Sequence, residues 1–204
     1  MNNVFYEKEG KKETSQRNLP HWDQGQKLYF VTFRLADSIP EPAMKELDQK
    51  RKHWLSKKQK SVTPNEQMTY FRLFNRKLER WLDDCHGDCV LANSECSSIL
   101  SETLKYFDRK RYRLDHWVIM PNHVHLLVLP EAEYSIEDIL HSWKSFSANK
   151  INEHLKRKGT LWRTESFDCI VRSHAQLQKF RQYIRENAEK ASGKAILSTG
   201  CWDD

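Results

Sequence analysis

Short alternating hydrophobic stretches and longer stretches with helical spacing follow one another along the chain. Stretches rich in aromatic and β-branched residues predict four strands, at about 27–35, 111–119, 123–129 and 161–171. Apolar residues spaced three and four apart, with capping and charge signals, predict helices at about 43–59, 64–84, 94–108, 135–158 and 174–191. Pro121 and Asn122 separate the second and third strands, which favours a hairpin.

The order of these elements predicts the fold class. Without the helices of 43–84, the order is the βαββαβ arrangement of ferredoxin-like domains, followed by one more helix. We therefore expect an α+β fold: an antiparallel sheet with helices on one face, an extra helical insertion at 43–84 and a C-terminal helix at 174–191. One domain should span 1–204, with a basic N-terminal arm at 1–22 and a flexible tail at 192–204.

The composition of the chain limits the kinds of partner that we expect it to bind. The 204 residues carry a formal net charge of +6, which favours a polyanion such as nucleic acid. No run of about 18 apolar residues occurs, and residues 1–10 lack the apolar core of a signal peptide. We expect a cytoplasmic, nucleoid-associated protein that is not bound to a membrane.

His123 and His125 are the first candidates for chemistry. Alternate side chains share one face of a strand, so both imidazoles project from the same face, a geometry that suits a divalent metal. Val124, Leu126 and Val128 occupy the other face. The pair alone is also compatible with two half-exposed strand histidines that bind nothing.

Tyr183 and Asn187 stand four residues apart in the last helix, so they are neighbours on its surface. A nucleophile and a third metal ligand could meet the histidines there. The alternative is a tyrosine that packs in the core with Leu177, Phe180 and Ile184.

Several motifs together resemble one family. Met120-Pro-Asn-His-Val-His-Leu-Leu-Val128 is similar to the histidine–hydrophobic–histidine segment of the single-tyrosine HUH transposases. Further stretches, 29–40, 107–114, 161–168 and 183–191, resemble more particularly the REP-associated tyrosine transposases. The resemblance covers most of residues 20–191. One departure is Ala188, where family members often have proline after the asparagine.

This resemblance implies a mechanism. Tyr183 would be the nucleophile, and His123, His125 and Asn187 would hold Mg²⁺ or Mn²⁺. The expected activity is cleavage and rejoining of single-stranded hairpin DNA from palindromic repeats, through a covalent 5′-phosphotyrosine. The protein could act as a monomer or a homodimer. The alternative is a non-catalytic binder of structured DNA or RNA with the same fold.

Basic side chains between and beside these motifs are candidate contacts for the DNA backbone, although each could be an ordinary solvated charge. They are Arg109, Arg111, Arg113, Lys144, Lys150, Arg163, Arg172 and Arg185.

Overall fold

A five-stranded antiparallel sheet forms the centre of the protein in a computed structural model, which describes residues 3–7, 13–16, 20–57, 64–191 and 195–199. The strand order is β6-β3-β5-β4-β7. The strands are β3 (Tyr29–Arg34), β4 (Tyr112–Ile119), β5 (His123–Pro130), β6 (Phe167–Ile170) and β7 (Ile196–Thr199). The predicted hairpin is confirmed, because β4 and β5 pair directly across Pro121 and Asn122.

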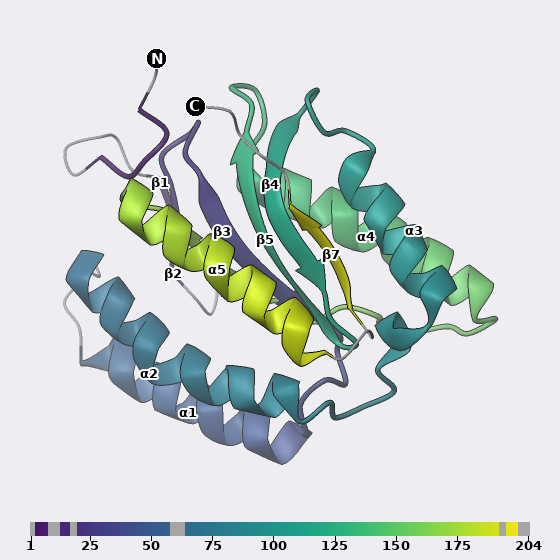
Figure 1. Cartoon of the computed structure of the whole chain (residues 1–204). Helices are drawn as coiled ribbons and strands as arrows, with labels where there is room; N and C mark the ends of the chain where they lie inside the picture. The colour runs from purple at the N-terminus through teal and green to yellow at the C-terminus, as the bar shows by residue number, and fades with distance from the viewer. Residues whose placement is uncertain (1–2, 8–12, 17–19, 58–63, 192–194, 200–204) are drawn as a thin grey trace.

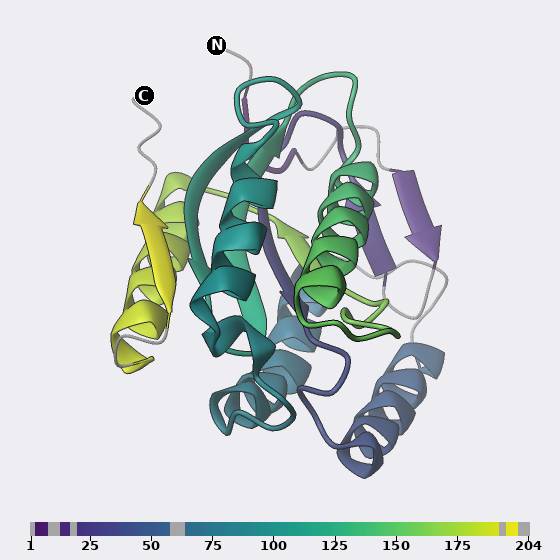
Figure 2. The same cartoon turned by 90° about the vertical axis from the view of Figure 1, so that its right-hand side faces the viewer.

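Helices cover both faces of this sheet (Figures 1 and 2). The two helices of the ferredoxin-like unit, α3 (Ser94–Lys105) and α4 (Ile136–His154), lie on one face, and α5 (His174–Lys190) lies on the other. The insertion forms α1 (Glu41–Ser56) and α2 (Pro64–Asp83), which run side by side below α5 in Figure 1. A 3-10 turn, η1 (Val90–Ala92), leads into α3. The predicted α+β fold is confirmed.

Alternation along the strands separates two hydrophobic cores. Val124, Leu126 and Val128 face the core beneath α3 and α4, while Leu127 and Leu129 face the core beneath α5. This period of two is the one expected for a sheet covered on both faces. The insertion has a smaller core of its own, made by residues of α1, α2 and the preceding loop: Ile39, Met44, Leu47, Phe74, Leu78 and Leu82.

Side-chain caps begin three of the described helices. Asn93 accepts hydrogen bonds from the backbone N–H groups of Glu95 and Cys96, and Ser135 accepts one from Asp138. Ser173 accepts one from the backbone N–H of Gln176 at the start of α5. Each cap satisfies backbone donors that have no partner inside the helix.

Two predictions about the chain ends are wrong. Part of the expected N-terminal arm forms a two-stranded antiparallel ribbon, β1 (Glu13–Gln16) and β2 (Pro20–Asp23). Part of the expected tail forms β7, which pairs with β4 at the edge of the sheet. Both errors have one cause: pairing through backbone groups needs no hydrophobic alternation, and strands of four residues are too short to display one.

None of the described helices is long and apolar enough to cross a lipid bilayer.

Candidate active site

His123 and His125 lie at the start of β5, directly after the hairpin turn. Each is only 1% exposed, which rules out the alternative of two half-exposed strand histidines. Their Nε2 atoms are 3.0 Å apart on the face of the sheet that α5 covers. The two imidazoles therefore converge on one point, as strand alternation predicts.

Hydrogen bonds to the opposite ring nitrogens orient both imidazoles. The Asn122 side chain donates from Nδ2 to the carbonyl of Leu82 (3.0 Å), so its oxygen is the acceptor for His123 Nδ1–H at 2.7 Å. His123 Nε2 therefore carries a lone pair. His125 Nδ1 lies 2.7 Å from the Thr32 hydroxyl on β3. Such partners typically fix the orientation of metal-binding histidines.

The burial of the pair keeps it uncharged. Burial, assisted by the nearby Arg34 guanidinium, lowers the pKa of His123 to about 3. Burial also holds the pKa of His125 well below its usual value, with contributions from His123 and Lys190. Because metals bind the neutral imidazole, both rings are in the protonation state that metal binding requires over the whole neutral pH range.

The spacing of the two nitrogens fits a divalent cation. Two ligand atoms about 2.1 Å from a metal, and at right angles around it, are about 3.0 Å apart. The two Nε2 atoms are separated by this distance. Among the described residues, no group of three or more His, Cys, Asp or Glu side chains forms a metal site. The further candidate ligand is the amide oxygen of Asn187.

Tyr183 meets the histidines from α5. Its hydroxyl lies 3.4 Å from His125 Nε2. One turn further on, Asn187 is 1% exposed and donates from Nδ2 to the Tyr183 carbonyl at 2.8 Å, a bond that does not use its amide oxygen. On the same face of the sheet, Phe30 of β3 stacks on Phe180 of α5, with ring centroids 4.2 Å apart. The structure thus brings all four predicted site residues together.

A carboxylate from the insertion also reaches Tyr183. The Tyr183 hydroxyl hydrogen-bonds Glu79 of α2, and Asp83 lies near the same group. Burial raises the pKa of Tyr183 well above its usual value, and the Glu79 carboxylate raises it further, whereas the Asn187 amide opposes the shift. The tyrosine is therefore protonated at neutral pH, and any reaction of its oxygen as a nucleophile would require a proton acceptor.

A buried polar network holds α5 against β4. One extra residue in β4 between Leu114 and Trp117 forms a bulge, so Asp115 and His116 both face α5. Asp115 accepts from Arg181 Nε at 2.8 Å and contacts His116 Nδ1 at 2.8 Å. His116 Nε2 lies 2.8 Å from Arg185 Nη2. The helix that carries Tyr183 is thereby fixed relative to the strand beside the histidines.

The eight candidate DNA contacts are spread over the molecule. Arg109, Arg111 and Arg113 lie at the end of β4 remote from the histidines, and Arg113 pairs with Glu131 at 3.2 Å. Arg163 and Arg185 lie on the same side of the sheet as the histidines.

The other three candidates have local partners. Lys144 donates to the carbonyls of Arg163 and Thr164, Lys150 pairs with Glu153, and Arg172 lies over the Tyr6 ring.

Sequence reasoning missed four residues at the site: Thr32, Asn122, Glu79 and Arg34. Thr32 and Arg34 do alternate with Phe30 on β3, and this polar alternation in an otherwise apolar strand is a usable signal. Asn122 was assigned only to the turn. Glu79 has no local signal, because its proximity to Tyr183 depends on how the insertion packs.

These features define a class: an α+β domain of ferredoxin-like topology with a paired-histidine centre and a tyrosine on an adjacent helix. Residues 90–187, which include all four site residues, match the family model described as "Transposase IS200 like". This part of the chain belongs to the IS200-like transposase family. It is a family of DNA-processing enzymes that generally use a divalent metal.

Solved structures show similarity over a larger part of the chain. A REP-associated tyrosine transposase bound to a REP hairpin is 14% identical, with a TM-score of 0.47, over 83% of this chain and 70% of that chain. A Deinococcus radiodurans R1 protein described as a transposase is 16% identical, with a TM-score of 0.39, over 78% of this chain and 89% of that chain. No curated protein matches the chain.

Proposed function

We propose that the protein cuts and rejoins single-stranded DNA through a covalent bond between Tyr183 and a 5′-phosphate. One observation carries the proposal: the Tyr183 hydroxyl lies 3.4 Å from His125 Nε2, which is itself 3.0 Å from His123 Nε2. A phosphate bound at the histidines would therefore meet the tyrosine oxygen directly. Proximity of this kind is a main source of rate enhancement in phosphoryl transfer.

His123, His125 and the Asn187 amide oxygen would hold Mg²⁺ or Mn²⁺. The bound metal would polarise a non-bridging oxygen of the scissile phosphate and offset negative charge in the transition state. Oxygen ligands suit either ion, and the imidazoles favour Mn²⁺.

The tyrosine performs the covalent step. Tyr183 Oη attacks phosphorus, the bond between phosphorus and the 3′-oxygen breaks, and the product is a 5′-phosphotyrosine with a free 3′-hydroxyl. Glu79, which accepts a hydrogen bond from Tyr183, is placed to take the phenolic proton, and the departing 3′-oxygen takes up a proton. The reverse reaction rejoins the strand without a nucleotide cofactor, because the phosphodiester bond energy is retained in the adduct.

The substrate class follows from the sequence motifs. They resemble those of the REP-associated branch, which supports single-stranded hairpin DNA from palindromic repeats. Because Tyr183 and the histidines meet within one chain, we propose that one protomer contains the whole site and acts in cis. The net charge of +6 is consistent with a polyanionic substrate.

The test uses the purified full chain and labelled single-stranded hairpin DNA, taken from palindromes that flank the gene. Protein is incubated with Mn²⁺ or Mg²⁺ and separated on a denaturing gel. We expect a covalent protein–DNA band with the wild type, none with Tyr183→Phe, and none with EDTA. Tyr106→Phe is the matched control, because Tyr106 is 73% exposed and remote from the site in sequence; it should retain the band.

Two results would contradict the proposal. Tight hairpin binding without an adduct in either metal would favour the non-catalytic binder. Metal-dependent hydrolysis that is unchanged in Tyr183→Phe would favour a hydrolase that activates water and does not use the tyrosine.

A further inference from the structure

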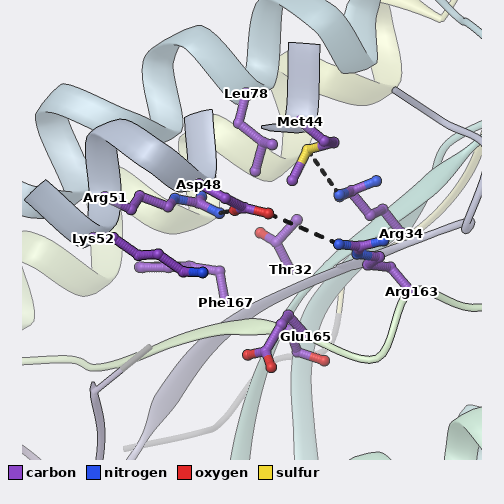
Figure 3. A pocket seen from close by; sticks show the side chains of 11 residues that line it. Thr32, Arg34, Met44, Asp48, Arg51, Lys52, Leu78, Arg163, Glu165 and Phe167 are labelled. Carbon is purple, nitrogen blue, oxygen red and sulfur yellow. Dashed lines mark hydrogen bonds and ion pairs between the residues drawn. The ribbon is translucent and has the colours of Figure 1, made fainter. Parts of the chain in front are cut away.

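A second polar site lies beside the paired histidines. A pocket of about 110 Å³ opens between α1 and the sheet, and Thr32, Arg34, Asp48, Arg51 and Arg163 line it (Figure 3). Pockets for drug-sized ligands measure roughly 300–1,000 Å³, so this one suits a small group better than a whole nucleotide.

The lining of the pocket is cationic. It contains four basic side chains, Arg34, Arg51, Lys52 and Arg163, against two carboxylates, Asp48 and Glu165. Four positive and two negative groups give a formal charge of +2. Such an excess in a partly enclosed space attracts an anion.

Arg34 is the most buried of these groups, with 6% of its surface exposed. Its guanidinium donates to the Ser38 hydroxyl at 2.9 Å and to the Met44 sulfur at 3.1 Å, neither of which is an anion. Burial and the neighbouring Arg163 and Arg51 lower the pKa of Arg34 to about 10. Asp48 acts in the opposite direction but is the smallest of these influences, so it balances the positive charge of Arg34 only in part.

The other two arginines both pair with Asp48. Arg51 Nη1 lies 3.5 Å from Asp48, and Arg163 Nη2 lies 3.9 Å from it, so both ion pairs are long. Figure 3 shows these groups directed toward one another across the pocket. Arg51 Nε is buried and has no hydrogen-bond partner among the described residues. A buried donor without a partner is costly, and an anion in the pocket would satisfy it.

The pocket and the histidine pair share a wall. Thr32 lines the pocket, and its hydroxyl lies 2.7 Å from His125 Nδ1. Arg34 stands opposite His123 in the register of β3 and β5. The pocket therefore adjoins the histidines at which we propose that the scissile phosphate binds.

We propose that this pocket binds a backbone phosphate of the same DNA strand, adjacent to the scissile one, through Arg34, Arg51 and Arg163. Planar guanidinium groups match phosphate oxygens in pairs, and three of them give a strong, sequence-independent contact. The inference rests on the proposed function, since it takes the substrate to be single-stranded DNA.

Binding is measured by fluorescence anisotropy with labelled hairpin DNA and EDTA, in a Tyr183→Phe background that cannot cleave. Arg51→Met keeps the aliphatic contacts of the side chain and removes the charge. We expect a roughly tenfold weaker Kd and a salt-dependence slope that is smaller by about 0.7, the value for one lost phosphate contact on a single strand. Lys45→Met, on an exposed position of α1, should leave the slope unchanged.

A second measurement locates the phosphate. Hairpins that carry one neutral methylphosphonate each are scanned along the strand. With wild-type side chains in the pocket, replacement of one particular phosphate near the cleavage position by methylphosphonate should lower the affinity for DNA. In Arg51→Met, the same replacement should have no effect on affinity. Arg163→Met repeats the test at a residue whose side chain is 42% exposed, where misfolding is less of a concern.

The outcomes separate this inference from the proposed function. A methylphosphonate profile that is the same in both arginine variants as in the wild type would overturn the pocket assignment, while a tyrosine adduct would still support cleavage. If inorganic phosphate raises the wild-type Tm, but not that of Arg51→Met, and the profile stays flat, the pocket binds free phosphate and the inference is wrong. A profile that depends on Arg51, with no adduct, would support the pocket and contradict catalysis.

Discussion

Replacement of Arg181 by methionine tests whether the buried network under α5 holds the tyrosine helix in place. Arg181 donates to Asp115 at 2.8 Å, and the Asp115 side chain has no exposed surface. Without the guanidinium, the hydrogen-bond partner that the carboxylate keeps among the described residues is His116. Breaking a buried pair on one side typically costs about 3–5 kcal/mol. Because Arg181 is 14% exposed and His116 remains, we expect the lower end, about 3 kcal/mol.

Urea unfolding followed by tryptophan fluorescence measures this loss. With a denaturant slope of about 2 kcal/mol per M, a loss of about 3 kcal/mol lowers the midpoint by about 1.5 M. Lys150→Met is the matched control, because it also removes one positive charge but from an exposed pair with Glu153. Such pairs contribute about 0–1 kcal/mol, so its midpoint should barely move.

A double variant sharpens the test. Asp115→Asn with Arg181→Met removes both charges and should be more stable than Arg181→Met alone, since no uncompensated buried carboxylate remains. If Arg181→Met unfolds at the same urea concentration as the control, the carboxylate is solvated after all. The network would then have no part in placing Tyr183.

Two further predictions concern the site itself. Because the folded-state pKa values of His123 and His125 are below the unfolded value near 6.5, only the unfolded state gains protons as pH falls from about 6.5 toward 3. In EDTA, the free energy of unfolding should therefore decrease as the pH falls, by up to about 1.4 kcal/mol per pH unit for each histidine. Urea unfolding at a series of pH values should show a weaker pH dependence for the double variant His123→Gln, His125→Gln. An equal pH dependence in the two proteins would refute this. Glu79→Gln should lower the pKa of Tyr183, seen as tyrosinate absorbance at lower pH than in the wild type, and yet slow adduct formation at neutral pH. Faster adduct formation in Glu79→Gln would show that Glu79 only raises the pKa of Tyr183 and does not take its proton.

The residues that sequence alone predicted are those whose geometry is local. Two histidines one residue apart on a strand must share a face, and a tyrosine four residues before an asparagine on a helix must adjoin it. These two rules predicted His123 with His125 and Tyr183 with Asn187. That the two pairs meet depends on the packing of α5 on β5, for which the resemblance in motifs was the only sequence evidence.

Features that depend on distant segments could not be predicted in this way. The neighbours of Asn122 in the sequence predict only a turn residue. Its amide also forms hydrogen bonds to both the end of α2 and His123. The β4 bulge turns Asp115 and His116 to one face, whereas regular alternation would send them to opposite faces. Neither effect leaves a periodic trace in the sequence.

The insertion of α1 and α2 contributes to both halves of the site. The ferredoxin-like unit and α5 provide the histidines and the tyrosine, the groups at which we propose that a metal and the scissile phosphate bind. Glu79 of α2 contacts the tyrosine hydroxyl, and Arg51 and Asp48 of α1 line the neighbouring pocket. The two helices also share a core of their own, so they pack together as one unit. Under the proposed function, the insertion would supply the group that takes the tyrosine proton and part of the pocket that binds the strand.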